Sequence, residues 1–172
     1  MCGGEDDQGV IYSECFYYSV SDKIWLFLQE LEVGRSFAAV ETLDGCLYVG
    51  GGKTSEGAES SVEVVGGDGC EDEGVVEELA VGVYGHCMVE VGGELVVVGG
   101  SPDSYGSTWV YNIVEKVWRN TSSPQKDRAS HGCTKVIIEQ EEAVLVAGND
   151  FSPQDLAEVK NDTKLDFFRF FS

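Results

Sequence analysis

The sequence predicts an all-β chain of the β-propeller type, and its repeats are the main reason. An apolar strand that ends in glycine or a Gly-Asn pair occurs three times, at residues 47–52, 95–100 and 144–149, at steps of 48 and 49 residues. A shortened copy, Gly3-Gly4, stands another 48 residues upstream of Gly51-Gly52. Repeats of about 40 to 50 residues with strand-like content are typical of propeller blades.

The best-formed unit also contains the strands that a blade requires. Residues 85–91 predict a first strand, Gly92-Gly93 a tight turn with positive φ, and residues 94–98 a second strand. After a polar loop, residues 107–113 predict a third strand, and a fourth begins near Trp118. Four short antiparallel strands per unit form a propeller blade.

Several residues at fixed places in these units resemble the kelch repeat family. In two units the glycine doublet is followed by a Tyr and, seven residues after that Tyr, by a Trp. Arg or His residues stand near the start of the first strand in several units. The residues that carry the resemblance are Gly51, Gly52, Gly99, Gly100, Gly148, Tyr18, Trp25, Tyr111, Trp118, Arg35, Arg128, His86 and His131.

The resemblance implies structural roles for these residues. Tyr and Trp are expected to fill the space between neighbouring sheets, and each His is expected to hydrogen-bond within the inner ring. The chain departs from the family pattern in its second and last units. Val64 takes the Tyr position, Val83 the Arg position, and Asn149 replaces the second glycine of the last doublet.

The predicted organisation is a single propeller region over residues 1–172 that holds three blades and part of a fourth. The partial blade covers residues 1–30, and the others cover about 35–80, 83–122 and 128–172. Closed propellers use about four to eight blades. The chain is therefore a fragment of a longer propeller, an array that closes by self-association through its open edges, or a four-bladed ring that lacks one inner strand. The aromatic tail at residues 167–171 favours the first two, because it would otherwise expose an edge strand.

The charge restricts the partners. With 31 acidic and 11 basic residues, the formal net charge is −20. Nucleic acid is excluded as a direct partner, because its binding needs clustered Lys and Arg. The acidic runs could hold a cation, face a basic protein, or simply form solvated loops.

Cysteine usage and the amino terminus bear on the compartment. Cys2 and Cys15 lie on adjacent predicted strands and form a possible disulfide, whereas free buried thiols are the alternative for the six cysteines. The acidic amino terminus does not resemble a secretory signal, and no apolar run is long enough for a membrane span. These features predict a cytoplasmic chain. The alternative is a secreted one with an incomplete amino terminus, for which the possible N-glycosylation sites at Asn120 and Asn161 are a weak indication.

The sequence contains no catalytic signature, and it predicts neither a cofactor nor a metal site. His86 and Cys87 are neighbours on one strand and point to opposite faces, so they cannot both enter the channel. The resemblance implies a protein-interaction module, and the substrate-recognition part of a larger adaptor is one such role. Its contact loops are expected at residues 53–59, 101–106 and 149–155, facing a basic protein partner. The alternative is part of a kelch-type enzyme, either a copper oxidase or a sugar-processing protein.

Overall fold

The computed structural model covers residues 1–172 and shows an all-β chain. It describes residues 1–66, 70, 74–102, 106–121, 127–150 and 165–169. These residues contain strands and turns but no helix.

Four antiparallel sheets follow one another along the chain. The first sheet contains β1 (Cys2–Glu5), β2 (Ile11–Ser19) and β3 (Ile24–Glu30). The second contains β4 (Ala39–Leu43), β5 (Cys46–Gly50), β8 (Val62–Val65) and β9 (Gly74–Val76), and the third contains β11 (Cys87–Val91), β12 (Glu94–Val98), β14 (Thr108–Asn112) and β15 (Val117–Asn120). The fourth contains β16 (Arg128–Ile138), β17 (Glu141–Asp150) and β18 (Leu165–Arg169).

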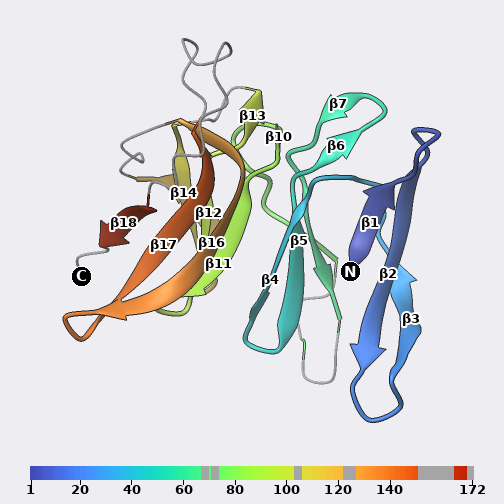
Figure 1. The fold of residues 1–172 in the computed structure, drawn as a ribbon, viewed down its shortest axis with the longest axis horizontal. Helices are drawn as coiled ribbons and strands as arrows, with labels where there is room; N and C mark the ends of the chain where they lie inside the picture. The colour runs from blue at the N-terminus through green and yellow to red at the C-terminus, as the bar shows by residue number, and fades with distance from the viewer. Residues whose placement is uncertain (67–69, 71–73, 103–105, 122–126, 151–164, 170–172) are drawn as a thin grey trace.

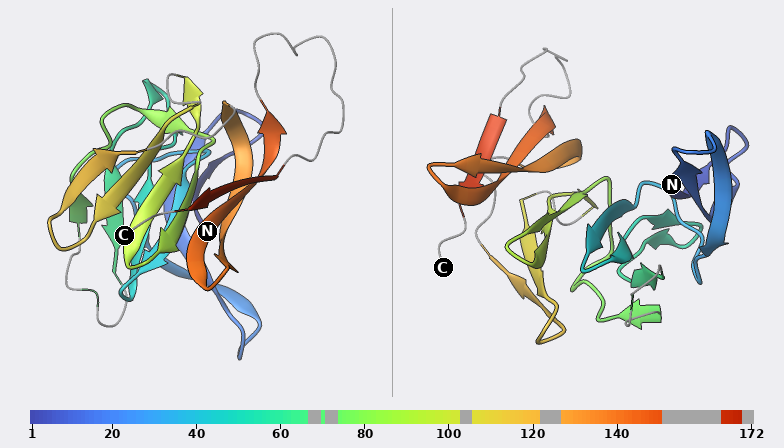
Figure 2. Two further views of the ribbon diagram at one scale, coloured as in Figure 1. Left: turned by 90° about the vertical axis from the view of Figure 1, so that its left-hand side faces the viewer. Right: turned by 90° about the horizontal axis from the view of Figure 1, so that it is seen from below.

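Two short ribbons lie at one end of these sheets. They are the hairpin of β6 (Lys53–Thr54) with β7 (Gly57–Ala58), and the pair of β10 (Val83–Tyr84) with β13 (Ser101–Pro102). Figure 1 shows both ribbons at the upper end of the molecule, where β17 also ends. The four sheets stand side by side in chain order, with the first and the fourth at opposite ends of the row (Figures 1 and 2).

Tight turns between the first two strands recur in three sheets. The predicted turn at Gly92-Gly93 is confirmed, with φ values of 63° and 79°. The second sheet places Asp44-Gly45 at the same point, and the fourth sheet places Glu139-Gln140 there, all with positive φ. Two consecutive residues with positive φ match the right-handed twist of a hairpin. Only the glycine pair was predicted, although Asp44-Gly45 carries the Asp-Gly signal for such a turn. Glu139-Gln140 carries no such signal, because Glu and Gln seldom adopt this conformation.

The core consists of apolar layers between consecutive sheets. Cys15, Leu31, Val49 and Val65 form the layer between the first and second sheets. The layer between the second and third sheets includes Tyr48, Val64, Leu95 and Tyr111. Between the third and fourth sheets lie Val89, Val96, Val98, Val144 and Val146, among others. Each sheet therefore buries at least one face against a neighbouring sheet, as wedge-shaped blades do.

The strand registers correct two expectations about the Tyr and Trp positions. Leu95 pairs with Tyr111 in the third sheet and Leu47 pairs with Val65 in the second, so Val65, and not Val64, takes the Tyr position. Tyr111 and Trp118 pack between sheets as expected. Tyr18 and Trp25 do not, because no described sheet lies on their side of the first sheet, and they are 45% and 58% exposed.

Candidate functional site: an acidic cleft beside the first sheet

Each glycine doublet bonds to the unit that follows it. The amide of Gly4 donates to the carbonyl of Arg35, Gly52 to Val83 and Gly100 to Arg128, at 2.7–2.9 Å. A Cβ on Gly51 would lie 2.4 Å from the Val83 carbonyl oxygen and 2.7 Å from a carbon of the His86 ring. The doublets thus allow a close backbone contact between sheets that any side chain would obstruct.

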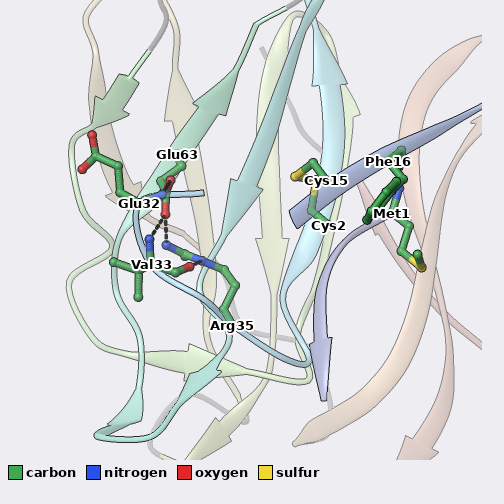
Figure 3. The surroundings of a disulfide bond; sticks show 8 residues. All are labelled: Met1, Cys2, Cys15, Phe16, Glu32, Val33, Arg35 and Glu63. Atoms are coloured by element: carbon green, nitrogen blue, oxygen red, sulfur yellow. Dashed lines mark hydrogen bonds and ion pairs between the residues drawn. A yellow bond between two sulfur atoms is a disulfide. The ribbon is translucent and has the colours of Figure 1, made fainter. Parts of the chain in front are cut away.

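Arg35 and Glu63 form a buried ion pair behind this contact. The Arg35 side chain is fully buried and donates to the Gly51 carbonyl at 2.8 Å, to Ser61 and to the Glu63 carboxylate. Glu63 also accepts hydrogen bonds from the amides of Glu32, at 2.6 Å, and Val33, at 3.1 Å (Figure 3). The pair therefore fastens the connection between the first and second sheets to β8. Arg128 repeats part of this arrangement by donating to the Gly148 carbonyl at 2.7 Å.

The two histidines lie against the doublets of the preceding units. His86 packs over Gly51 and His131 over Gly99, and their ring nitrogens have no hydrogen-bond partner among the described residues. The expected hydrogen bonding within the inner ring is therefore not observed. Burial, and then the charge of His131, lowers the pKa of His86 to about 4, and the nearby Gly50 carbonyl opposes this without reaching hydrogen-bonding geometry. Burial and the Arg128 charge likewise lower the pKa of His131 to about 4.

We expect the buried His86 to make the protein unstable in mild acid. Its pKa is about 4 in the folded state and 6.5 when unperturbed, so the unfolded chain binds the proton first as the pH falls. The unfolding free energy should therefore be highest above about pH 6.5 and fall between that pH and about 4. The fall caused by His86 is on the order of 3 kcal/mol. Urea unfolding at pH 7, 6, 5 and 4.5 measures it.

The His86→Leu variant is the control for this pH dependence. A leucine of similar volume keeps the packing over Gly51 but cannot titrate, so we expect a shallower slope of the unfolding free energy over the same range. A wild-type free energy that is flat from pH 7 to pH 5 would contradict the assignment. The carboxylates with lowered pKa, such as Glu59 and Glu90, titrate at lower pH.

A cleft of about 750 Å³ lies between the first sheet and the β6–β7 hairpin. Its walls come from the end of β1, the start of β2, the connection between the first two sheets, and the hairpin. The lining residues are Glu5, Gly9, Ile11, Glu32, Val33, Gly34, Lys53, Thr54, Ser55, Glu56 and Glu59.

The cleft is strongly acidic. Glu5, Glu32, Glu56 and Glu59 supply four carboxylates against the one ammonium of Lys53, which lies 3.7 Å from Glu5. Partial burial of Glu59 acts to raise its pKa, but hydrogen bonds from Ser61 and Ser60 outweigh it and hold the pKa below its usual value. Glu32 and Glu56 are exposed to solvent. The cleft thus presents ionised carboxylates that suit the ammonium or guanidinium groups of a partner.

Only one of the three expected contact loops lines this cleft. Residues 53–59 contribute through the β6–β7 hairpin, whereas residues 103–105 and 151–155 of the other two lie outside the described residues. Glu5 and Glu32 were missed by the sequence interpretation. A signal for Glu5 exists, because it follows the Gly3-Gly4 doublet directly, as Lys53 follows Gly51-Gly52.

All six cysteines are paired. Cys2 is bonded to Cys15 within the first sheet (Figure 3), Cys46 to Cys70 in the second unit, and Cys87 to Cys133 between the third and fourth sheets. The described residues contain no cluster of three or more His, Cys, Asp or Glu that could bind a metal ion. Asn120 is exposed at the end of β15, and Asn161 lies outside the described residues. A helix that is long and apolar enough to cross a membrane does not occur in the described part of the chain.

Comparison with known proteins identifies the third unit. Residues 82–125 match the family model described as the Kelch motif. The chain carries a kelch motif. With its all-β sheets in chain order, it has the architecture of an incomplete kelch-type propeller. No curated protein matches the chain. Kelch motifs generally mediate protein–protein interaction, so the kelch assignment indicates an interaction module.

Proposed function

We propose that this kelch chain is a protein-interaction module that binds a basic segment of its partner in the acidic cleft. The observation that carries the proposal is the concentration of four carboxylates around one ammonium in a cleft. The cleft is lined in part by the β6–β7 hairpin, and Figure 1 shows this hairpin and the β10–β13 ribbon at the same end of the sheets. Rigid scaffolds place binding surfaces on such connecting loops.

Charge supports a basic partner over a neutral one. The net charge of −20 attracts cationic segments over a distance set by the salt concentration, and it speeds their association. The partner would place Lys or Arg side chains beside the exposed Glu32 and Glu56. A copper oxidase or a sugar-processing enzyme is the alternative function. No described group of metal ligands supports the first of these.

A labelled arginine-rich peptide tests the proposal. Its affinity for the full chain is measured by fluorescence anisotropy at about 50 and 200 mM salt. We expect the dissociation constant to rise at least about fivefold with salt, and about tenfold in the Glu32→Gln/Glu56→Gln variant. The matched control, Glu41→Gln/Glu115→Gln, removes the same charge outside the cleft and should change the constant less than about twofold. Equal effects of the two variants, or binding that salt leaves unchanged, would overturn the assignment of the cleft.

The disulfides support an oxidising compartment in place of the expected cytoplasmic one. Disulfides are rare in cytosolic proteins, where thiol reductants keep cysteines reduced. Since every cysteine of this chain is bonded, we propose that the chain matures in the secretory pathway or an equivalent oxidising compartment. Self-association through the first and fourth sheets, whose outer faces no described sheet covers, is a second mode of binding that we propose.

A further inference from the structure

Aromatic side chains cover the outer face of the first sheet. Phe16 and Phe27 form a cross-strand pair with ring centroids 5.8 Å apart, and Tyr18 and Trp25 form the next pair at 5.5 Å. Tyr18, Trp25 and Phe27 are 45%, 58% and 56% exposed. Exposed aromatic patches of this kind mark interaction surfaces.

The third sheet shows what such a face binds. Tyr111 pairs with Trp118 as Tyr18 pairs with Trp25, and the rings are 5.0 Å apart. Tyr111 is only 1% exposed because it packs against the second sheet, where its ring lies 6.3 Å from that of Tyr48. The Trp118 indole donates to the Glu77 carbonyl of the second unit at 2.8 Å. The Tyr–Trp face of one sheet is thus built to cover the preceding sheet.

The fourth sheet carries the complementary face. Tyr48 on β5 and Val96 on β12 occupy equivalent places and pack against the sheets that follow them. Leu145 on β17 stands 49 residues after Val96 at the same place. Its neighbours Val144 and Val146 pack toward the third sheet, so Leu145 lies on the opposite face, and it is only partly buried. No described sheet follows it.

We propose that two copies of this chain join head to tail, the Tyr18–Trp25 face of each packing on the Leu145 face of the other. This deepens the self-association proposed above. Both junctions of the pair would reproduce the contact that the chain already makes between its second and third sheets. A two-fold axis closes such a pair into one ring, which leaves neither face open. Four sheets from each copy give eight, at the upper end of the usual range for propellers of about four to eight blades.

The response to salt distinguishes this self-association from the binding of a basic partner in the acidic cleft. Two chains of net charge −20 repel each other, and salt screens that repulsion. Salt should therefore tighten the pairing of two copies, whereas it should weaken binding in the acidic cleft. One proposal can fail while the other holds.

Light scattering after size-exclusion chromatography tests the pairing with the intact, oxidised chain. We expect the mass of two chains at 0.5 M salt and about 50 µM protein, and a smaller dimer fraction at low salt. Trp25→Asp should raise the dissociation constant on the order of 30-fold or more, because it removes an aromatic anchor. Since Trp25 is exposed within one chain, the variant should keep the β-sheet circular dichroism of the wild-type chain, which shows that it still folds.

Val114→Asp is the matched control. It adds the same charge at an apolar residue that is 86% exposed and lies outside the aromatic face, and the two-chain mass should persist. A monomer at every salt concentration would overturn the proposal. So would an unchanged dimer in Trp25→Asp, which would place the contact elsewhere, or open polymers in place of a closed pair.

Discussion

The Glu63→Gln variant is expected to lose about 3 kcal/mol or more of unfolding free energy. Arg35 is fully buried, and the Glu63 carboxylate is its one anionic partner among the described residues. Without that carboxylate, a guanidinium charge is left in the interior with neutral acceptors only. The amides of Glu32 and Val33 also lose a charged acceptor, which loosens the connection between the first two sheets. For a chain of this size the melting temperature should fall by roughly 6 to 12 °C.

The Arg119–Glu94 pair provides the control for this experiment. Its contact is 2.7 Å, but the Arg119 side chain is 50% exposed, so Glu94→Gln should cost less than about 1 kcal/mol. Urea unfolding followed by circular dichroism gives both free energies. Equal losses in the two variants would show that Arg35 does not depend on Glu63. Replacing both partners, as Arg35→Met with Glu63→Leu, should recover part of the lost stability, because no buried charge is then left alone.

The repeated parts of the fold were accessible from the sequence, because they recur at equal spacing. Short sequence patterns that recur in several units determine the glycine doublets, the turn at Gly92-Gly93 and the four strands of the third unit. Glu63 was missed because it occurs once. Its only signal is an acidic residue inside the apolar strand β8, all four residues of which are buried. A pattern of this kind does not tell which distant arginine neutralises the acid.

Disulfides and side-chain groups that join different units could not be predicted from the sequence for a similar reason. The Cys2–Cys15 bond was expected because the two strands are neighbours in one sheet. Six cysteines allow 15 connectivities, and spacing alone does not choose among them. The acidic cleft combines Glu5 and Glu32 with a hairpin from the next unit. It depends on how two sheets stand against each other, which no local pattern encodes.

Removing the Cys87–Cys133 disulfide is expected to cost about 4 kcal/mol of unfolding free energy. The bond joins β11 of the third sheet to β16 of the fourth, and the two cysteines are 46 residues apart in the chain. It therefore restrains a long loop in the unfolded chain, which is the main source of disulfide stabilisation. Besides this bond, the two sheets share a valine-rich layer and the partly exposed contact of Lys135 on β16 with Glu90 on β11. The Gly100 amide also donates to the Arg128 carbonyl, and the Gly92 amide to the Glu142 carboxylate. The bond is the one covalent link between these two sheets among the described residues.

Comparing Cys87→Ala/Cys133→Ala with Cys2→Ala/Cys15→Ala isolates this effect. The second bond spans 13 residues and should contribute only about 3 kcal/mol, within a sheet that its own hydrogen bonds also hold. Urea unfolding ranks the two variants. Limited proteolysis should cut the Cys87/Cys133 variant first in the fourth sheet, because that sheet opens locally before the others do. If the variant unfolds as one unit at the wild-type midpoint, the apolar layer alone holds the fourth sheet in place. The disulfide would then contribute no measurable unfolding free energy.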